Sequence, residues 1–267
     1  MNVQKNSYTI IYASIMVVAV AAILTAVSFG LKDRQQNNID NEKRQNILKT
    51  VNVEANDENA AQLFEQTVKE AFVVNEKGEI IESNKDNAFK TSISISDENC
   101  QLPVFKCEKD GKAYFVVPLK GNGLWGDIWG YASLESDLNT IAGVVFDHAS
   151  ETPGLGDKIT TKEFQQLFVG KKLYDEGSQD LKGVTIYKGG LAKNDPLHGI
   201  DALSGATLTS NGVQNMINDC FKVYQAYFKN ISTSAPVVEQ PKEVECSDSL
   251  ATAIPACDST NVNTINE

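Results

Sequence analysis

One stretch, from Asp201 to Gly212, concentrates the side chains that could bind a phosphate group. Its sequence, DALSGATLTSNG, is followed at once by an amphipathic pattern, so we expect a loop that leads into a helix. The first N–H groups of a helix have no acceptor within it, and the helix dipole adds positive potential, which together favour a phosphate. The alternative is an ordinary N-cap cluster, because serine and threonine favour that position for hydrogen-bonding reasons alone. Four hydroxyl residues belong to this turn: Ser204, Thr207, Thr209 and Ser210.

A glycine-rich stretch at Gly121–Gly126, with the sequence GNGLWG, formally has the G-x-G-x-x-G spacing of dinucleotide-binding loops. That fingerprint requires a helix to follow, whereas the residues that follow here, DIWGYA, are typical of a strand. We therefore exclude a dinucleotide fold and expect the glycines to allow close approach of the backbone. Trp125 in this loop is a candidate stacking platform for an aromatic ring, or alternatively an ordinary core tryptophan.

A second unusual stretch is Glu151–Gly156, with the sequence ETPGLG. One proline and two glycines predict a rigid loop with free backbone N–H groups, which could meet the polar edge of a ring while Leu155 contacts its face. The alternative is a surface turn before the next helix. Glu151 and Asp157 do not form a convincing acid–base pair, because no nucleophile accompanies them.

The composition excludes several classes of protein. The chain has 267 residues, a net charge of −11 and a pI of about 4.8. Nucleic-acid binding requires clustered lysine and arginine, so we expect no nucleic-acid partner. The five cysteines include no C-x-x-C pair and only two histidines accompany them, so we expect no metal site. A disulfide between Cys100 and Cys107 and two free thiols remain equally open alternatives.

The segment Tyr8–Leu31 contains no charged residue and is long enough to cross a bilayer as a helix of roughly 33–36 Å. It is too long for a signal peptide, so we predict a retained membrane anchor. More basic residues follow this segment than precede it, which would by itself keep the main domain in the cytoplasm. Long domains can translocate against that bias, so charge alone leaves the orientation open.

The remaining chain predicts an α+β fold with antiparallel sheets and a long C-terminal helix. We expect a helical stalk over 32–56, a short helix over 57–66, a brief helix over 161–168 and an amphipathic helix over 210–229 whose apolar stripe includes Cys220. Strand patterns with turn residues between them predict three hairpins. Their strands are expected at 68–74 with 79–82, at 104–107 with 113–119, and at 128–134 with 141–146, and a further strand is expected at 184–187.

Five segments are predicted: an N-terminal segment over 1–7, a transmembrane helix over 8–31, the stalk over 32–56, one domain over 57–230 and a tail over 231–267. The tail is rich in Ser, Thr, Asn, Pro and acidic residues and lacks a sustained period, so we expect it to be disordered. Three glycine-containing loops together suggest a flat ligand that carries a phosphate.

A family resemblance narrows this hypothesis. The motif Ser204–Thr207 (SGAT), with Asp201 before it and LTSNGV after it, closely resembles the flavinylation motif of the FMN-binding family. Gly123–Trp125, the ETPGLG stretch and the single N-terminal anchor resemble, in the same order, the C subunits of sodium-translocating NADH:quinone reductases. The resemblance covers roughly residues 1–230.

The resemblance implies that FMN is esterified through its phosphate to Thr207, by a flavin transferase that works outside the cytoplasm. It therefore implies a periplasmic FMN-binding domain on a single-pass anchor in the bacterial inner membrane. Thr209 and Ser210 would then act as caps or phosphate donors. The implied cofactor-binding residues are Trp125, Glu151, Thr152, Leu155, Gly156, Lys158, Ser204, Gly205 and Ala206.

The resemblance further implies a role as an electron-relay subunit, active only within its complex, which passes electrons from NADH to ubiquinone and exports sodium. Its partners would be the B subunit, the membrane subunits D and E, the flavin transferase and membrane lipid. One alternative is the equivalent G subunit of an Rnf-type electron transport complex. Another is an anchored extracytoplasmic binding protein without a cofactor, in which Ser204–Ser210 only caps a helix.

Overall fold

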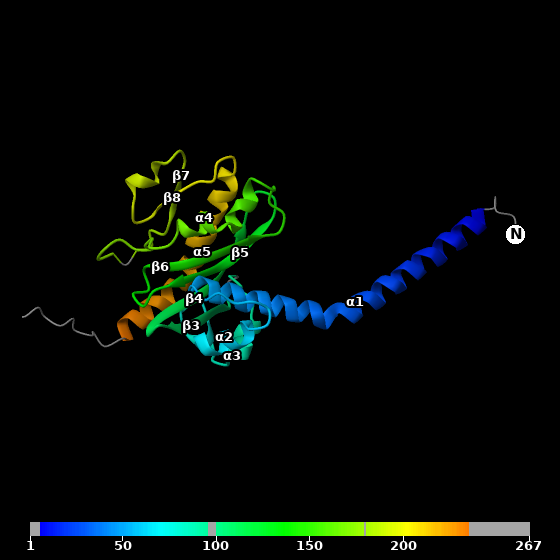
Figure 1. The fold of residues 1–267 in the computed structure, drawn as a ribbon, viewed down its shortest axis with the longest axis horizontal. Helices are drawn as coiled ribbons and strands as arrows, with labels where there is room; N and C mark the ends of the chain where they lie inside the picture. Colours follow the sequence, from blue (N-terminus) through cyan, green and yellow to red (C-terminus); the bar gives the residue numbers. More distant parts are fainter. Residues whose placement is uncertain (1–5, 96–99, 179, 235–267) are drawn as a thin grey trace, which may run out of the picture. The chain divides into compact units, whose positions relative to one another are not determined.

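A long N-terminal helix and a six-stranded antiparallel sheet dominate the computed structural model, which describes residues 6–95, 100–178 and 180–234 (Figure 1). The sheet order is β2-β1-β3-β4-β5-β6. Its strands are β1 (Val68–Val74), β2 (Ile80–Glu82), β3 (Leu102–Lys109), β4 (Lys112–Asn122), β5 (Asp127–Leu134) and β6 (Ile141–His148). The α+β class and the antiparallel sheet are as predicted.

All three predicted hairpins are present, as the pairs β1–β2, β3–β4 and β5–β6. The turn between β3 and β4 is formed by Asp110 and Gly111, which both have positive φ, at 51° and 74°. This geometry matches the right-handed twist of the flanking strands and explains the Asp-Gly pair. Two further antiparallel pairings, β1–β3 and β4–β5, join the hairpins into one sheet.

Each face of the sheet has its own core, because successive side chains of a strand point to opposite faces. Val104 and Val117 belong to the core that includes α5 (Thr207–Ser234), whereas Phe105 and Val116 belong to the core on the other face. The second core also contains side chains of α2 (Ala60–Thr67), of α3 (Lys85–Lys90) and of the end of α1 (Asn6–Thr50). The sheet is therefore covered by helices on both faces (Figure 1).

The prediction of a separate stalk was incomplete, because α1 continues without a break from Asn6 to Thr50, through the predicted transmembrane segment and most of the predicted stalk. Residues 9–39 of α1 are exposed, but Ile47, Leu48 and Val51 are buried in the second core. The end of the stalk is thus part of the folded domain. α1 is also the one helix within the described residues that is long and apolar enough to cross a membrane.

The elements after β6 are short and lead to α5. They are η1 (Gly156–Thr160), α4 (Lys162–Gln166), β7 (Thr185–Tyr187), η2 (Leu191–Asn194) and β8 (Gly199–Asp201). β7 and β8 pair in parallel. Thr161 is the N-cap of α4, because its hydroxyl accepts a hydrogen bond from the N–H of Phe164. Two side chains of α5, Gln214 and Asn218, bond to the backbone of Ile186 and Val184 and so attach the β7 segment to the helix.

The thiols of Cys107 and Cys220 form no disulfide. The predicted alternative of a disulfide between Cys107 and Cys100 is therefore not realised. Cys107 lies in the second core, where burial raises its pKa to about 12. Cys220 is a core residue, as expected from its place in the apolar stripe of α5. Cys246, Cys257 and the predicted disorder of the tail beyond Ser234 lie outside the described residues, whereas residues 231–234 belong to α5.

Candidate functional site

The three motif stretches, which are far apart in the sequence, meet at the N-terminal end of α5. Gly212 of α5 packs so closely on the carbonyl of Asn122 and on Gly123 that a Cβ would not fit there. The Leu155 side chain lies against Gly205, and Gly156 faces the hydroxyl of Thr209. The glycines therefore allow the close backbone approach that their sequence pattern predicted.

α5 begins at Thr207, three residues earlier than the predicted start at Ser210. The strand β8 delivers the chain to the preceding turn, in which Gly205 adopts a left-handed φ of 77° that favours glycine. The first helical hydrogen bond runs from the N–H of Ser210 to the carbonyl of Ala206. The N–H groups of the turn before Ser210 have no acceptor within the helix, as a phosphate site requires.

The four hydroxyls of the motif fall into two pairs. Thr209 and Ser210 are buried, with 1% and 0% of their surface exposed. The Thr209 hydroxyl donates to Glu151 Oε2 at 2.7 Å, and the Ser210 hydroxyl donates to the Ala206 carbonyl at 3.0 Å while accepting from the N–H of Leu203. Thr207 is half-buried and Ser204 is exposed, so these two hydroxyls are the accessible ones. Thr209 and Ser210 were expected to act as caps or phosphate donors; neither occupies the N-cap position, because both lie inside the first turn of α5.

Glu151 lies beneath these loops, with 4% of its surface exposed. Its Oε1 accepts from the N–H of Trp125 at 2.9 Å, and its Oε2 accepts from Thr209. Burial alone would raise the pKa of this carboxyl, but the hydrogen bonds from Trp125, Thr209 and the backbone of Leu124 outweigh burial and hold the pKa below its ordinary value of 4.5. Glu151 is therefore an ionised carboxylate within the protein.

The predicted ring-contact residues lie at the surface of this site. Trp125 is 67% exposed and Leu155 is 42% exposed, and Thr152 and Lys158 are exposed as well. Trp125 is thus not a core tryptophan. Two further exposed leucines, Leu124 and Leu208, flank the motif and were not predicted, although leucines within polar loops are a signal that could have identified them.

Two observations fit a flat ligand that carries a phosphate. Exposed apolar side chains belong to the three stretches that meet at a helix N-terminus, whose first N–H groups lack helical acceptors. In addition, Asp157 Oδ1, just beyond the Glu151–Gly156 loop, is buried and has no hydrogen-bond partner within the described part of the chain. It is an acceptor that a donor group of a ligand could satisfy.

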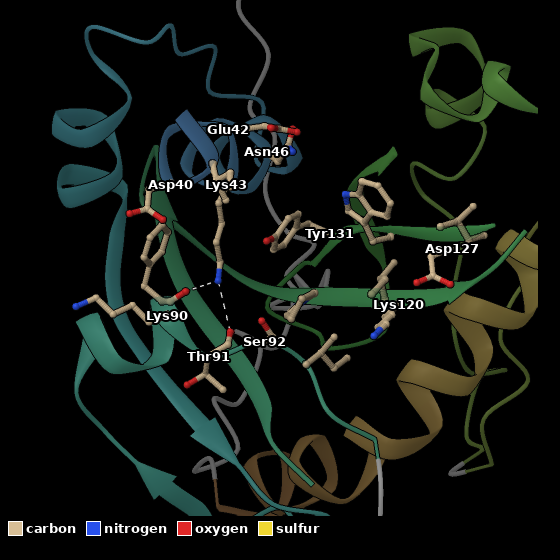
Figure 2. A pocket seen from close by; sticks show the side chains of 18 of the residues that line it. Asp40, Glu42, Lys43, Asn46, Lys90, Thr91, Ser92, Lys120, Asp127 and Tyr131 are labelled. Carbon is tan, nitrogen blue, oxygen red and sulfur yellow. Dashed lines mark hydrogen bonds between the residues drawn. The ribbon is translucent and has the colours of Figure 1, made fainter. Parts of the chain in front are cut away.

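A separate pocket lies between α1, the segment after α3, and strands β4 and β5 (Figure 2). Lys43 of α1 extends into it and donates to the carbonyls of Phe89 and Thr91, and burial lowers the pKa of this lysine. None of the predicted site residues lines this pocket. Its polar contacts connect α1 to the end of α3.

Comparison with known proteins finds similarity to a family of FMN-binding domains and to subunits of one sodium-translocating enzyme. The model of the family described as FMN-binding domain matches residues 123–222, which include all three motif stretches except the first two residues of the Gly121–Gly126 loop. The C subunit of the Na(+)-translocating NADH-quinone reductase of Vibrio parahaemolyticus serotype O3:K6 is 31% identical over 217 residues, which span 72% of this chain and 81% of that protein.

Two solved structures share the fold. The crystal structure of the C subunit of the Na(+)-translocating NADH-quinone reductase from Parabacteroides distasonis has a TM-score of 0.67 and 39% identity, covering 74% of this chain and 96% of that one. The crystal structure of Shewanella oneidensis NqrC has a TM-score of 0.63 and 31% identity, covering 73% and 98%. The similarity thus extends well beyond the short motifs.

Proposed function

This chain belongs to the family of C subunits of the Na+-translocating NADH-quinone reductase, and from that premise we propose that it carries FMN in covalent linkage on Thr207. Covalently held FMN supplies the complex with an electron carrier that cannot dissociate. The chain is accordingly an electron-relay subunit that contributes to the translocase only within its complex.

The observation that carries the assignment of Thr207 is the accessibility of the four motif hydroxyls. Thr209 and Ser210 are buried and already donate hydrogen bonds, so neither hydroxyl is free to be esterified. Of the two accessible hydroxyls, only that of Thr207 belongs to the helix itself. A phosphodiester on the first helical residue would lie where unpaired N–H groups and the dipole stabilise its negative charge.

The other predicted residues have roles that follow from their exposure. Trp125, Thr152, Leu155 and Lys158 are exposed and would contact the ring, and burial on that side tunes its potential. The residues that complete the site are Gly156, Ser204, Gly205, Ala206 and Glu151. The turn at Ser204–Ala206 leaves room for the ribityl chain, whereas Glu151 acts from beneath the loops.

The transmembrane segment over 8–31 would anchor the chain in the inner membrane, with the domain on the periplasmic side where its flavin transferase works. The partners are then the B subunit and the membrane subunits D and E. To test the periplasmic side, a phosphatase fused after Ser234 should be active in intact cells. To test the partners, mass spectrometry of the proteins that co-purify with the chain should recover these subunits. An inactive fusion, or recovery of an Rnf-type complex instead, would contradict these assignments.

The covalent linkage is tested by expressing the chain together with a flavin transferase of its family. The denatured protein should remain fluorescent, and peptide mass should show one FMN-sized adduct on Thr207. Thr207→Ala should abolish the adduct, because the remaining accessible hydroxyl, that of Ser204, lies outside the helix.

Thr209→Ala is the matched control, since it removes another threonine hydroxyl of the motif, one that is already hydrogen-bonded to Glu151, and should leave the adduct in place. An adduct that persists in Thr207→Ala, or one that is absent from the wild-type chain under these conditions, would refute the assignment.

A further inference from the structure

The carboxylate of Glu151 is an unusual group to bury. Taking an ionised carboxyl out of water is unfavourable unless a charge or several donors compensate it. None of the ion pairs among the described residues involves Glu151. Its compensation comes from hydrogen-bond donors and from the N-terminal end of α5, where Thr209 lies in the first turn.

The hydrogen bonds of Glu151 connect three segments that are distant in sequence. One carboxylate oxygen bonds to the loop that carries Trp125, and the other bonds to the first turn of α5, two residues from Thr207. Its own N–H donates to His148 Nδ1 at 3.2 Å, which attaches it to the end of β6. One side chain therefore fixes the ring side of the site relative to the phosphate side.

Two glycines enclose the carboxylate and leave it little freedom. A Cβ at Gly123 would overlap Oε1, and a Cβ at Gly156 would overlap Oε2 and come close to the Thr209 hydroxyl. Both glycines belong to the motif stretches, and Gly123 has no left-handed φ that would require glycine. Their small size is explained by the space that Glu151 occupies.

We propose that Glu151 is a positioning residue, which holds the Trp125 loop and the first turn of α5 in one fixed arrangement before any flavin is attached. The role of this arrangement in flavin binding rests on the proposed function, in which the two segments are the ring side and the phosphate side of the flavin site. The arrangement itself is a property of the chain alone. It can therefore be measured without flavin.

The chain contains two tryptophans, so Trp129→Phe leaves Trp125 as the single indole emitter. In that background and without flavin transferase, Glu151→Ala should lower the steady-state fluorescence anisotropy of Trp125, because its loop loses the bond to the carboxylate. Glu151→Gln should largely restore the anisotropy, since an amide oxygen can accept from the Trp125 N–H while the amide nitrogen donates to Thr209. Glu108→Ala, at an exposed glutamate of β3, is the matched control and should have no effect.

Unchanged anisotropy in a folded Glu151→Ala variant would overturn the proposal, as would a decrease of equal size in Glu108→Ala.

A double-mutant cycle on unfolding free energy provides a second measurement. Thr209→Val should destabilise the wild-type chain but add little to Glu151→Ala, because the two residues share one bond. Fully additive changes in unfolding free energy would show that Glu151 and Thr209 do not act through their shared hydrogen bond, and would overturn this part of the proposal.

Flavin-loaded chains separate this inference from the proposed function. If FMN is attached to Thr207, its own fluorescence anisotropy should also fall in Glu151→Ala. If the wild-type chain never acquires FMN, the proposed function fails, whereas the Trp125 measurement still decides the role of Glu151.

Discussion

At the scale of single residues, Glu151 also makes the site sensitive to acid. Its folded-state pKa lies below the ordinary value of 4.5, because hydrogen bonds from Trp125 and Thr209 outweigh the opposing effect of burial. A group with a depressed pKa contributes stability that is present above its unfolded-state pKa and is lost as the pH falls through the folded value. The contribution of Glu151 should thus be complete above about pH 5 and decline below about pH 4.5.

Glu151→Gln removes this titration and keeps the shape of the side chain. The difference in unfolding free energy between wild type and variant should therefore be constant near neutral pH and shrink as the pH falls below about 4.5. Urea denaturation between pH 7 and pH 3.5 would measure it. A difference that grows toward acidic pH has the wrong sign and would exclude an ionised Glu151.

The sequence predicted the hydroxyl-rich motif but not the role of each hydroxyl. Burial of Thr209 depends on Glu151, which lies 58 residues earlier in the chain, and no local pattern encodes that distance. The same limit applies to Trp125, whose exposure depends on how its loop packs on α5. Composition and spacing identified the loops, whereas only their packing distinguishes the residues that face outward.

At the scale of elements, the hairpins were predictable because turn chemistry is local. Asp110–Gly111 has positive φ at both positions, and Asn75 accepts hydrogen bonds from two N–H groups of the turn that ends near Gly78. The order in which the hairpins join was not predicted: no turn links β1 to β3, and the glycines of the Gly123–Gly126 turn between β4 and β5 were assigned to close backbone approach and not to a hairpin. α3 and β8 were missed because they have six and three residues, too few to show a period.

The segment that brings β8 to the site is held by a buried histidine. His198 is fully buried, with Nδ1 at 2.9 Å from the carbonyl of Gly183 and Nε2 at 3.0 Å from Asp175 Oδ1. Hydrogen bonds from Lys182 and His198 lower the pKa of Asp175, so its carboxylate accepts a hydrogen bond. The Gly183 carbonyl can also only accept a hydrogen bond. Each ring nitrogen therefore lies within hydrogen-bond distance of an acceptor oxygen.

Replacement of this histidine should loosen the element that delivers the chain to α5. His198→Gln can satisfy at most one of the two acceptors with similar geometry, so we expect a loss of about 1–3 kcal/mol in unfolding free energy. Chemical denaturation at neutral pH would measure it, with Glu176→Gln, at the exposed residue beside Asp175, as the control. An unchanged stability of His198→Gln would show that the two hydrogen bonds of the imidazole ring do not hold this segment.

At the scale of the whole molecule, α1 has two different functions along one continuous helix. Its first part is apolar and exposed, as a membrane anchor requires, whereas its last turn belongs to the core of the domain. The Ser133 hydroxyl of β5 donates to the carbonyl of Thr50 at 2.7 Å, and Gly143 of β6 leaves room for the same carbonyl. The anchor is therefore joined to the sheet through the helix itself.

This arrangement predicts where the chain can be shortened. A chain that begins at Lys32 lacks the apolar segment but keeps Ile47, Leu48 and Val51, so it should be soluble and folded. A chain that begins at Asn52 loses three buried side chains, each worth about 1.5–3 kcal/mol, and their sum approaches the total stability of a typical domain. We expect the shorter chain to be unfolded or aggregated, and circular dichroism with thermal denaturation would compare the two. Equal stability of both chains would mean that the end of α1 merely rests on the domain, and the predicted boundary at residue 57 would then stand as a true domain boundary.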